Sequence, residues 1–563
     1  MQKHFYTGEK NHQIIISLLK AHNVRFVVAS PGSANSVFIG SIQNDDFFKI
    51  YSAVDERSAA YIACGLALES GEPVVISCTG ATAARNYMSG MTEAYYSKLP
   101  ILILTSSQPS RNVGHLFAQV TDRTLPPKDV CRISLCLPTI HTPEEEWECE
   151  VVANKALLEL FRDGGGPVHL NLITTYSYNC TTALTQKNLP NSRVINRYVY
   201  GNTLPKIEVA KVGIFVGSHK PFSKEQIEKI ELFCESNNAV VFCDHTSNYN
   251  GKYKIQYALV INQASLNKNN TPAFTPDLLI HIGEISGEEG AMRMIRSKET
   301  WRVSDDGELR DTFKNMTAVF EMSEKYFFTQ YLHCETNSTT YYSECLSLYD
   351  SFDKSIPDQM DKMGFSNVWI ALNTAPMIPD NSTVVLSILN TLRTWNYAKF
   401  KQGVHVYSPV GGFGIDGATS MLLGASLYNS QKKYFGIVGD LAFFYDLNTL
   451  GNRHVNKNLR LLVINNGCGV EFKKSYAMAY RLLENDVDPF VAAAGHFGNQ
   501  SAYLVKHFAE DLGFDYMSAV SKSDFLEKMK YFVSDNNCEK PMLFEVFVSA
   551  ETDVAALDII HNR

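Results

Sequence analysis

Short apolar runs alternate with longer segments of helical periodicity along most of this chain. In the N-terminal part, the runs expected as strands are residues 25–29, 50–54, 73–77 and 100–104, and a helix is expected at 57–69. In the central part, strands are expected at 239–243 and 278–282. Strands that are separated by helices pair in parallel, with helices covering both faces of the sheet. The sequence therefore predicts an α/β protein built from doubly wound parallel sheets.

Two polar clusters follow consecutive predicted strands near the C-terminus. The run 434–438 ends at Gly439 and Asp440, before a helix expected at 441–450, and the run 461–464 ends at Asn465 and Asn466. The carboxyl ends of parallel strands meet at one edge of a sheet, where such folds bind ligands. A carboxylate, an amide oxygen and turn carbonyls suit Mg²⁺ that also holds a phosphate ester, and a helix amino end faces the same spot. The clusters predict a metal-bridged diphosphate site.

Simpler interpretations of these clusters exist. Asp440 after a strand is often a helix cap, and Asn-Asn-Gly is a common turn. Gly412, Gly414 and Gly417 also match the spacing of the dinucleotide fingerprint, with Asp440 at the end of the next strand. A nicotinamide or flavin oxidoreductase is therefore one alternative, although it leaves Asn466 without a role, and a non-catalytic binding protein is another.

Composition excludes several classes of function. The chain has 563 residues, 45% of them hydrophobic and 20% charged, and this length predicts several domains of an ordinary globular protein. A net charge of −8 without a basic run argues against a nucleic-acid surface. No run is long enough to cross a membrane, and the twelve cysteines lack metal-binding spacing. We expect a cytoplasmic protein with reduced thiols.

Two N-terminal turns are candidates for chemistry. Asp55 and Glu56 stand where a strand passes into an apolar helix, so that Asp55 is a plausible helix cap and Glu56 a plausible buried proton-transfer group. Residues 78–83, Cys-Thr-Gly-Ala-Thr-Ala, form a turn of small side chains. Such a turn permits either close packing or the close approach of a ligand.

These motifs carry a family resemblance. Residues 54–60, 78–80 and 93–96 resemble the pyrimidine-binding domain of thiamine-diphosphate enzymes. Gly439-Asp440 with Asn465-Asn466 resembles their metal motif, and its third residue, Leu441, is the variant of menaquinone-pathway enzymes. The chain is similar to the 2-succinyl-5-enolpyruvyl-6-hydroxy-3-cyclohexene-1-carboxylate synthase family over nearly its full length.

The resemblance implies thiamine diphosphate and Mg²⁺ as cofactors and assigns roles to named residues. Glu56 would hydrogen-bond the aminopyrimidine ring and assist removal of the thiazolium C2 proton, and Gln119 resembles a glutamine that faces the cofactor in acetolactate synthases. Ile415 would support the bent cofactor. The remaining cofactor contacts implied are Ser33, Thr79, Gly80, Asn86, Gly414, Asp416, Gly439, Asp440, Leu441, Ala442, Asn466, Cys468, Gly469 and Val470, with Asp440, Asn466 and Cys468 as metal ligands.

The resemblance also implies how the chain is divided into domains. We expect a pyrimidine-binding domain at 1–190, a cofactor-free central α/β domain at 195–335 and a diphosphate- and metal-binding domain at 360–563. In this family the cofactor site lies between two subunits, which implies a homodimer or homotetramer.

The expected substrates differ from those of the family. Ala34, Gln108, Val410 and a position near Trp395 stand where its synthases carry arginines for substrate carboxylates. We therefore predict a decarboxylase or carboligase that takes a 2-oxo acid donor and an acceptor carbonyl or alkene other than 2-oxoglutarate and isochorismate. Two alternatives remain. One is transfer to a keto sugar, as by an acetolactate synthase. The other is the menaquinone reaction itself, with Arg393, Arg111 and Arg85 replacing the lost cations.

Overall fold

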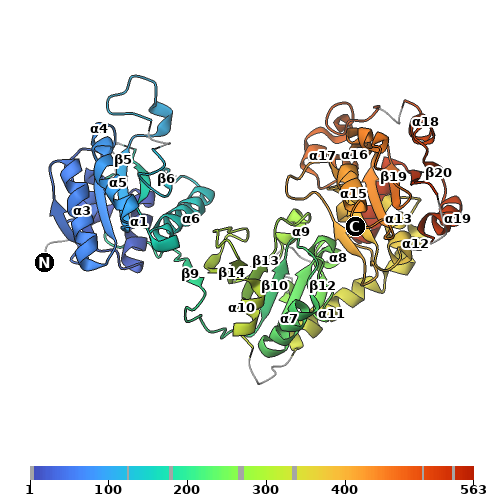
Figure 1. Ribbon diagram of the computed structural model, residues 1–563, viewed down its shortest axis with the longest axis horizontal. Coiled ribbons are helices and arrows are strands. Elements are labelled where there is room, and N and C mark those ends of the chain that lie inside the picture. Colours follow the sequence, from blue (N-terminus) through green and yellow to red (C-terminus); the bar gives the residue numbers. More distant parts are fainter. Residues whose placement is uncertain are drawn as a thin grey trace. The chain divides into compact units, whose positions relative to one another are not determined.

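In a computed structural model, the chain forms parallel sheets covered by helices, as the alternating pattern predicts (Figure 1). The structure describes residues 5–122, 126–175, 182–263, 272–332, 339–496, 500–534 and 539–563. The chain divides into two compact units, one of residues 1–202 with 307–321 and one of 203–306 with 322–563. The predicted domain boundary at 335 lies outside the described residues.

The first unit contains a six-stranded parallel sheet of order β3-β2-β4-β5-β7-β6 (blue to cyan in Figure 1). Its strands are β2 (Phe26–Ala29), β3 (Lys49–Ser52), β4 (Val74–Thr79), β5 (Ile101–Ser107), β6 (Ser134–Leu137) and β7 (Val168–Ile173). Its helices are α1 (Lys10–Ala21), α2 (Ser36–Ile42), α3 (Glu56–Ser70), α4 (Thr82–Asn86), α5 (Met88–Tyr96) and α6 (Pro143–Glu159). Two short pairs complete the unit: β1 (Tyr6–Thr7) with β8 (Leu184–Gln186), and β9 (Asn196–Val199) with β15 (Met316–Glu321).

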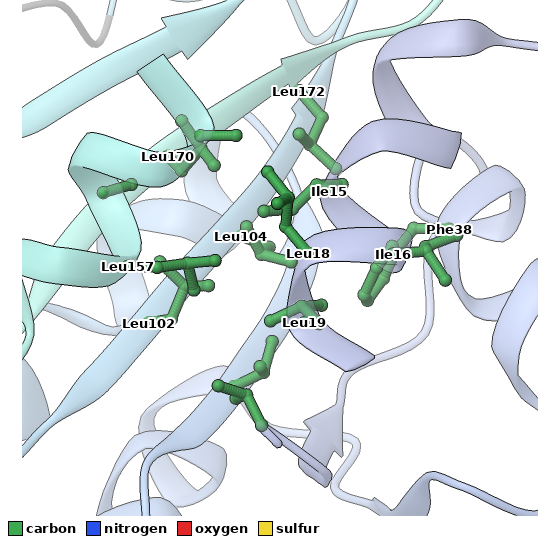
Figure 2. Packing of buried hydrophobic residues seen from close by; sticks show 14 of the residues in the cluster. Ile15, Ile16, Leu18, Leu19, Phe38, Leu102, Leu104, Leu157, Leu170 and Leu172 are labelled. Atoms are coloured by element: carbon green, nitrogen blue, oxygen red, sulfur yellow. The ribbon is translucent and has the colours of Figure 1, made fainter. Parts of the chain in front are cut away.

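One hydrophobic core lies on each face of this sheet. In the first, Ile15, Leu18 and Leu19 of α1 point toward Leu104 of β5, with Leu157 of α6 alongside (Figure 2). The second core packs α3 and α5 against the opposite face. Helix α3 starts at the predicted cap, because the Asp55 side chain accepts from the backbone N–H of Arg57.

The second unit contains two parallel sheets. In the central one, the strands that belong to this unit run in the order β12-β11-β10-β13-β14, and two of them begin and end at the predicted residues. The strands are β10 (Val212–Val216), β11 (Ala239–Cys243), β12 (Lys254–Gln256), β13 (Leu278–Ile282) and β14 (Glu299–Ser304). The helices are α7 (Lys224–Asn237), α8 (Tyr257–Ile261), α9 (Glu289–Met292), α10 (Glu324–Gln330) and α11 (Thr340–Asp353).

The C-terminal sheet has six parallel strands in the order β17-β16-β18-β19-β21-β20. They are β16 (Thr383–Leu386), β17 (His405–Tyr407), β18 (Tyr434–Gly439), β19 (Leu459–Asn465), β20 (Asp515–Ala519) and β21 (Met542–Phe547). The helices are α12 (Ile356–Lys362), α13 (Asn367–Thr374), α14 (Asn390–Trp395), α15 (Ala418–Ser426), α16 (Asp440–Tyr445), α17 (Met478–Leu483), α18 (Leu504–Asp511), α19 (Lys522–Val533) and α20 (Ala550–Ile560). Because β16 and β19 flank β18, the turns after these three strands lie at one edge.

The single helix predicted at 441–450 is wrong. Helix α16 ends at Tyr445, and a 3₁₀ turn follows over 447–451. The reason is Asp446, which accepts hydrogen bonds from the backbone N–H and the hydroxyl of Ser420, both at 2.5 Å, and from Thr449 at 2.8 Å. The Asp446 side chain thus bonds the first turn of α15, and helix α16 ends before this residue.

Across the described ranges, no helix is long and apolar enough to cross a membrane. The nine cysteines in those ranges are free thiols, and eight of them are buried.

Candidate functional site

The metal-motif residues of the second unit lie together at the carboxyl ends of β18 and β19. The backbone N–H of Gly467 donates to a carboxylate oxygen of Asp440 at 3.1 Å, which joins the two predicted clusters. Asp440 is 5% exposed, and burial raises the pKa of its carboxyl to about 7. Within the described ranges no cationic side chain pairs with it. A buried carboxylate without a counter-ion is costly, and a bound cation would relieve that cost.

Asn466 is held by a residue that the sequence reasoning missed. Its amide nitrogen donates to Asp553 of α20 at 2.9 Å, while the second Asp553 oxygen accepts from the backbone of Asn367 at 2.6 Å. The amide oxygen of Asn466 receives only a long bond from the N–H of Cys468, at 3.4 Å. Asp553 therefore fixes the amide so that its oxygen remains available to a ligand. An aspartate in the first turn of a helix near the C-terminus carries no sequence signal for such a role.

The rest of the motif loop is tightly packed. The carbonyl of Cys468 accepts from the N–H of Val470 at 3.1 Å, and the N–H of Gly469 donates to Ala492 at 2.6 Å. The Cys468 side chain is buried, and burial raises the pKa of its thiol to about 12, so a backbone oxygen is the ligand this residue can offer. The donors are one carboxylate, one amide and one carbonyl, which are the hard oxygens that Mg²⁺ prefers.

The remaining predicted contacts in this unit flank the same edge. Gly439 and Asp440 join β18 to α16, and Leu441 and Ala442 lie in the first turn of that helix. Gly414, Ile415 and Asp416 stand in the loop between β17 and α15, with Ile415 half-buried. A cavity of about 660 Å³ adjoins the motif loop and is lined by Asn466, Cys468 and Lys473 among others.

The first unit brings a second group of predicted residues together. The Asn86 side chain donates to the carboxylate of Glu56 at 3.0 Å, so two predicted cofactor residues are in direct contact. Glu56 is half-buried in this unit rather than buried as expected.

Thr79 and Gly80 end β4, where the loop before Ser33 covers them. A Cβ on Gly32 would lie 2.0 Å from the Thr79 hydroxyl, so only glycine permits this approach. That hydroxyl is buried, and no described group bonds it. Gln119 is exposed, with a positive φ of 61°.

The positions that lack the family's arginines are mostly core positions. Trp395 is fully buried, and its indole N–H donates to Asn367 at 3.1 Å. Ala34 and Val410 are 4% and 3% exposed, and Gln108 accepts from its neighbour Asn112. Trp395 is therefore a core residue in this structure.

Of the three possible replacement cations, two are solvent-exposed. Arg111 and Arg85 both lie in the first unit, and Arg85 lines a cavity of about 240 Å³. Arg393 is in the second unit, where its Nη1 lies 2.5 Å from a carboxylate oxygen of Glu471.

The central segment contributes a buried acid that the sequence analysis does not single out. Glu288 is 3% exposed and accepts from the Asn396 side chain at 2.8 Å. Burial raises the pKa of its carboxyl to about 7. Glu288 could not be recognised from the sequence, because it lies in a polar loop and meets Asn396 only through the tertiary fold.

Comparison with known proteins identifies the class of protein. The family described as "Thiamine pyrophosphate enzyme, N-terminal TPP binding domain" matches residues 10–125. The protein is therefore a thiamine-diphosphate-dependent enzyme, and the oxidoreductase and non-catalytic alternatives are set aside.

Curated relatives match the whole chain. A 2-succinyl-5-enolpyruvyl-6-hydroxy-3-cyclohexene-1-carboxylate synthase of Phocaeicola vulgatus is 30% identical, covering 98% of both chains. Proteins of the same name from Bacteroides thetaiotaomicron and Flavobacterium johnsoniae are 28% and 26% identical, covering 99% of both chains and 96% and 97% respectively. The chain belongs to the 2-succinyl-5-enolpyruvyl-6-hydroxy-3-cyclohexene-1-carboxylate synthase family.

Proposed function

We propose that this protein uses thiamine diphosphate and Mg²⁺ to decarboxylate a 2-oxo acid and to transfer the remaining fragment to an acceptor carbonyl or alkene. The observation that carries the proposal is the buried Asp440 carboxylate, which lacks a counter-ion and lies against the Asn466 loop. Bound thiamine diphosphate supplies a nucleophilic thiazolium carbon and an electron sink for the loss of CO₂.

The motif residues would hold the cofactor's charged end. Asp440, Asn466 and the carbonyl of Cys468 would bind Mg²⁺ through oxygen, and the first turn of α16 would face the diphosphate. The Gly414–Asp416 loop and Val470 would border the rest of the cofactor, with Ile415 supporting its bent form. Asp553 acts through Asn466 and is a positioning residue.

In the first unit, Glu56 would hydrogen-bond the aminopyrimidine ring and so assist removal of the thiazolium C2 proton. Asn86, which donates to Glu56, would orient that carboxyl group. The buried Thr79 hydroxyl and the backbone of Gly80 would lie against the ring, with Ser33 nearby. Gln119 is retained as a proposed cofactor-facing residue on the resemblance alone.

We further propose that the donor or acceptor differs from the pair used in menaquinone synthesis. Each charge-assisted hydrogen bond to a substrate carboxylate is worth about 1.5–3 kcal/mol, and the lost arginines would have made several. The candidate replacement in the second unit, Arg393, is already paired with Glu471. The second candidate is the menaquinone reaction itself, which the names of the curated relatives favour. The family resemblance supports a homodimer or homotetramer.

The proposal is tested in two steps. Titration calorimetry of thiamine diphosphate with Mg²⁺ should detect binding to the wild type and none to Asp440→Ala, whose fold circular dichroism should show to be intact. Unchanged affinity in this variant would overturn the metal site.

CO₂ release is then measured across a panel of 2-oxo acids, with and without acceptors. Turnover of a less charged acid, with negligible product from 2-oxoglutarate and isochorismate, is the expected outcome. Efficient synthesis from that pair would establish the second candidate instead.

A further inference from the structure

A cavity of about 540 Å³ lies between the two sheets of the second unit. One wall is formed by β12, the edge strand of the central sheet, and by the turn after β11. The other wall is formed by β17, the edge strand of the C-terminal sheet, and by residues 399–402, which precede it. Among the described residues, none lines both this cavity and the cavity beside the metal motif, so the two are separate sites.

Side chains from one wall bond the backbone of the other. The Asn248 amide donates to the carbonyl of Val406 at 2.9 Å and accepts from the N–H of the same residue at 2.9 Å. The Asn250 amide donates to the carbonyl of Gln402 at 2.8 Å. These bonds fix the spacing of the two walls, so the cavity is already formed by the fold, as small-molecule sites usually are.

The segment 252–256, which includes β12, turns its polar side chains toward the cavity. Successive residues of a strand point to opposite faces, so Lys252, Lys254 and Gln256 share one face. All three line the cavity, while Tyr253 and Ile255 between them are each 1% exposed. The alternation therefore directs two cations into the cavity from this wall.

The opposite wall adds two more cations, Lys399 and Lys401. Among the described residues that line the cavity, four are lysines and one, Glu231, is acidic. The Glu231 carboxylate already accepts from the backbone N–H of Lys252 at 2.7 Å. Because the whole chain carries a net charge of −8, the excess of positive charge is a local feature of this cavity.

Two of these lysines are available to a ligand. The other two have acidic partners outside the lining: Lys252 with Glu235 at 3.4 Å and Lys399 with Asp353 at 2.6 Å. Lys254 bonds the amide oxygen of Asn250 at 3.3 Å, and in the described part of the chain no carboxylate pairs with it or with Lys401. Each wall therefore presents one lysine without an acidic partner.

Protection of the sheet edges is a simpler explanation for these lysines. Charged side chains on an edge strand keep it from pairing with other chains. That role needs only lysines that point into open solvent. It explains neither why lysines of two different edge strands line one cavity nor why Lys254, which is half-buried, lacks a carboxylate.

We propose that this cavity binds a small phosphorylated molecule with at least two negative charges, held by Lys254 on one wall and Lys401 on the other. Lysine ammonium groups bind phosphate oxygens as compact point charges with three donors each. The volume lies within the range of small-molecule sites, roughly 300–1,000 Å³. The site goes beyond the proposed function, because it shares no residue with the proposed cofactor contacts.

The test is titration calorimetry on protein loaded with thiamine diphosphate and excess Mg²⁺, so that the cofactor site is filled and cannot take the probe. The probes are ADP and fructose bisphosphate, with adenosine and fructose as their uncharged counterparts. The variants are Lys254→Gln and Lys401→Gln. Lys530→Gln is the matched control, because it removes the same charge from an exposed position on α19 of the same unit.

We expect at least one phosphorylated probe to bind the wild type while its uncharged counterpart does not. The probe that binds shows whether the ligand is a nucleotide or a sugar phosphate. Each cavity variant should lower that affinity by about tenfold or more, the equivalent of one charge-assisted hydrogen bond, and Lys530→Gln should leave it unchanged. The bound probe should also raise the thermal unfolding midpoint of the wild type more than that of either cavity variant.

Three results would overturn the proposal. These are no binding of either phosphorylated probe at millimolar concentration, equal affinity for the uncharged counterpart, and wild-type affinity in both cavity variants. If the lysines only protect the sheet edges, the variants should aggregate more readily and the wild type should bind no probe. Lys401 is exposed, so Lys401→Gln keeps the test valid if Lys254→Gln does not fold.

Discussion

Asp553 offers a sharp test, because its effects on stability and on cofactor binding should separate. Replacing it with alanine leaves the N–H of Asn367 and the amide of Asn466 without an acceptor. Each buried orphan donor costs about 1–3 kcal/mol, or roughly 2–6 kcal/mol together. The same change removes a fully buried carboxyl whose pKa burial raises from 3.8 to about 6. At neutral pH, its ionisation costs about 3 kcal/mol of folding free energy.

These terms offset each other, so the free energy of unfolding should fall by no more than about 3 kcal/mol. Cofactor binding has no such compensation. With Asn466 free to rotate, Mg²⁺-dependent thiamine-diphosphate affinity should fall by about 10–100-fold, as for other groups that orient metal ligands. Asp553→Asn keeps one acceptor oxygen, so its cofactor affinity should lie between those of the alanine variant and the wild type.

Urea unfolding and titration calorimetry measure the two quantities on the same samples. Asp558→Asn, on the same helix α20, is the matched control and should match the wild type in both. If Asp553→Ala binds the cofactor as tightly as the wild type while folded, Asp553 does not position Asn466 for a metal, and the reasoning fails.

Three further predictions concern other parts of the chain. The Glu56→Gln variant should still bind thiamine diphosphate, but exchange of the cofactor's C2 proton should be slower by about 10²-fold or more, as measured by NMR after acid quench. An exchange rate equal to that of the wild type would show that Glu56 takes no part in removing this proton. Leu104 is fully buried in the core shown in Figure 2, so Leu104→Ala should lower the free energy of unfolding, measured by urea titration, by about 2–5 kcal/mol. A loss below about 1 kcal/mol would contradict the packing described. Burial lowers the pKa of the His245 and His561 rings from 6.5 to about 3. As the pH falls below 6.5, these two histidines therefore take up protons in the unfolded chain but not in the folded one. Each histidine should therefore remove stability as pH falls, by up to about 1.4 kcal/mol per pH unit, and His245→Gln should show a shallower decline between about pH 6 and 4 than the wild type.

Sequence pattern predicts those elements whose signal is local. Strands β11 and β13 begin and end at the predicted residues because each is a short, mainly apolar run bounded by polar turns. The Asp440 carboxylate contacts the turn that follows Asn466, because parallel strands bring their carboxyl ends to one edge.

Elements whose bounds or roles depend on residues far away in the sequence cannot be predicted from local pattern. Helix α16 ends early because the Asp446 side chain bonds Ser420, which the helical periodicity of 441–450 does not reveal. Asp553 and Glu288 acquire their roles only when α20 and a central loop fold against the C-terminal sheet. For the same reason, Arg393 can be named as a cation from the sequence, but its neutralisation by Glu471 cannot.

The unpaired Asp440 carboxylate also has a consequence for how long the protein survives in a cell. A ligand that binds only the folded state stabilises it by mass action, by about 2.7 kcal/mol at a concentration one hundred times its dissociation constant. Protein without cofactor lacks this stabilisation, so it should unfold transiently more often. Because proteases act on the opened chain, the supply of thiamine would then govern the steady-state amount of this enzyme as well as its turnover.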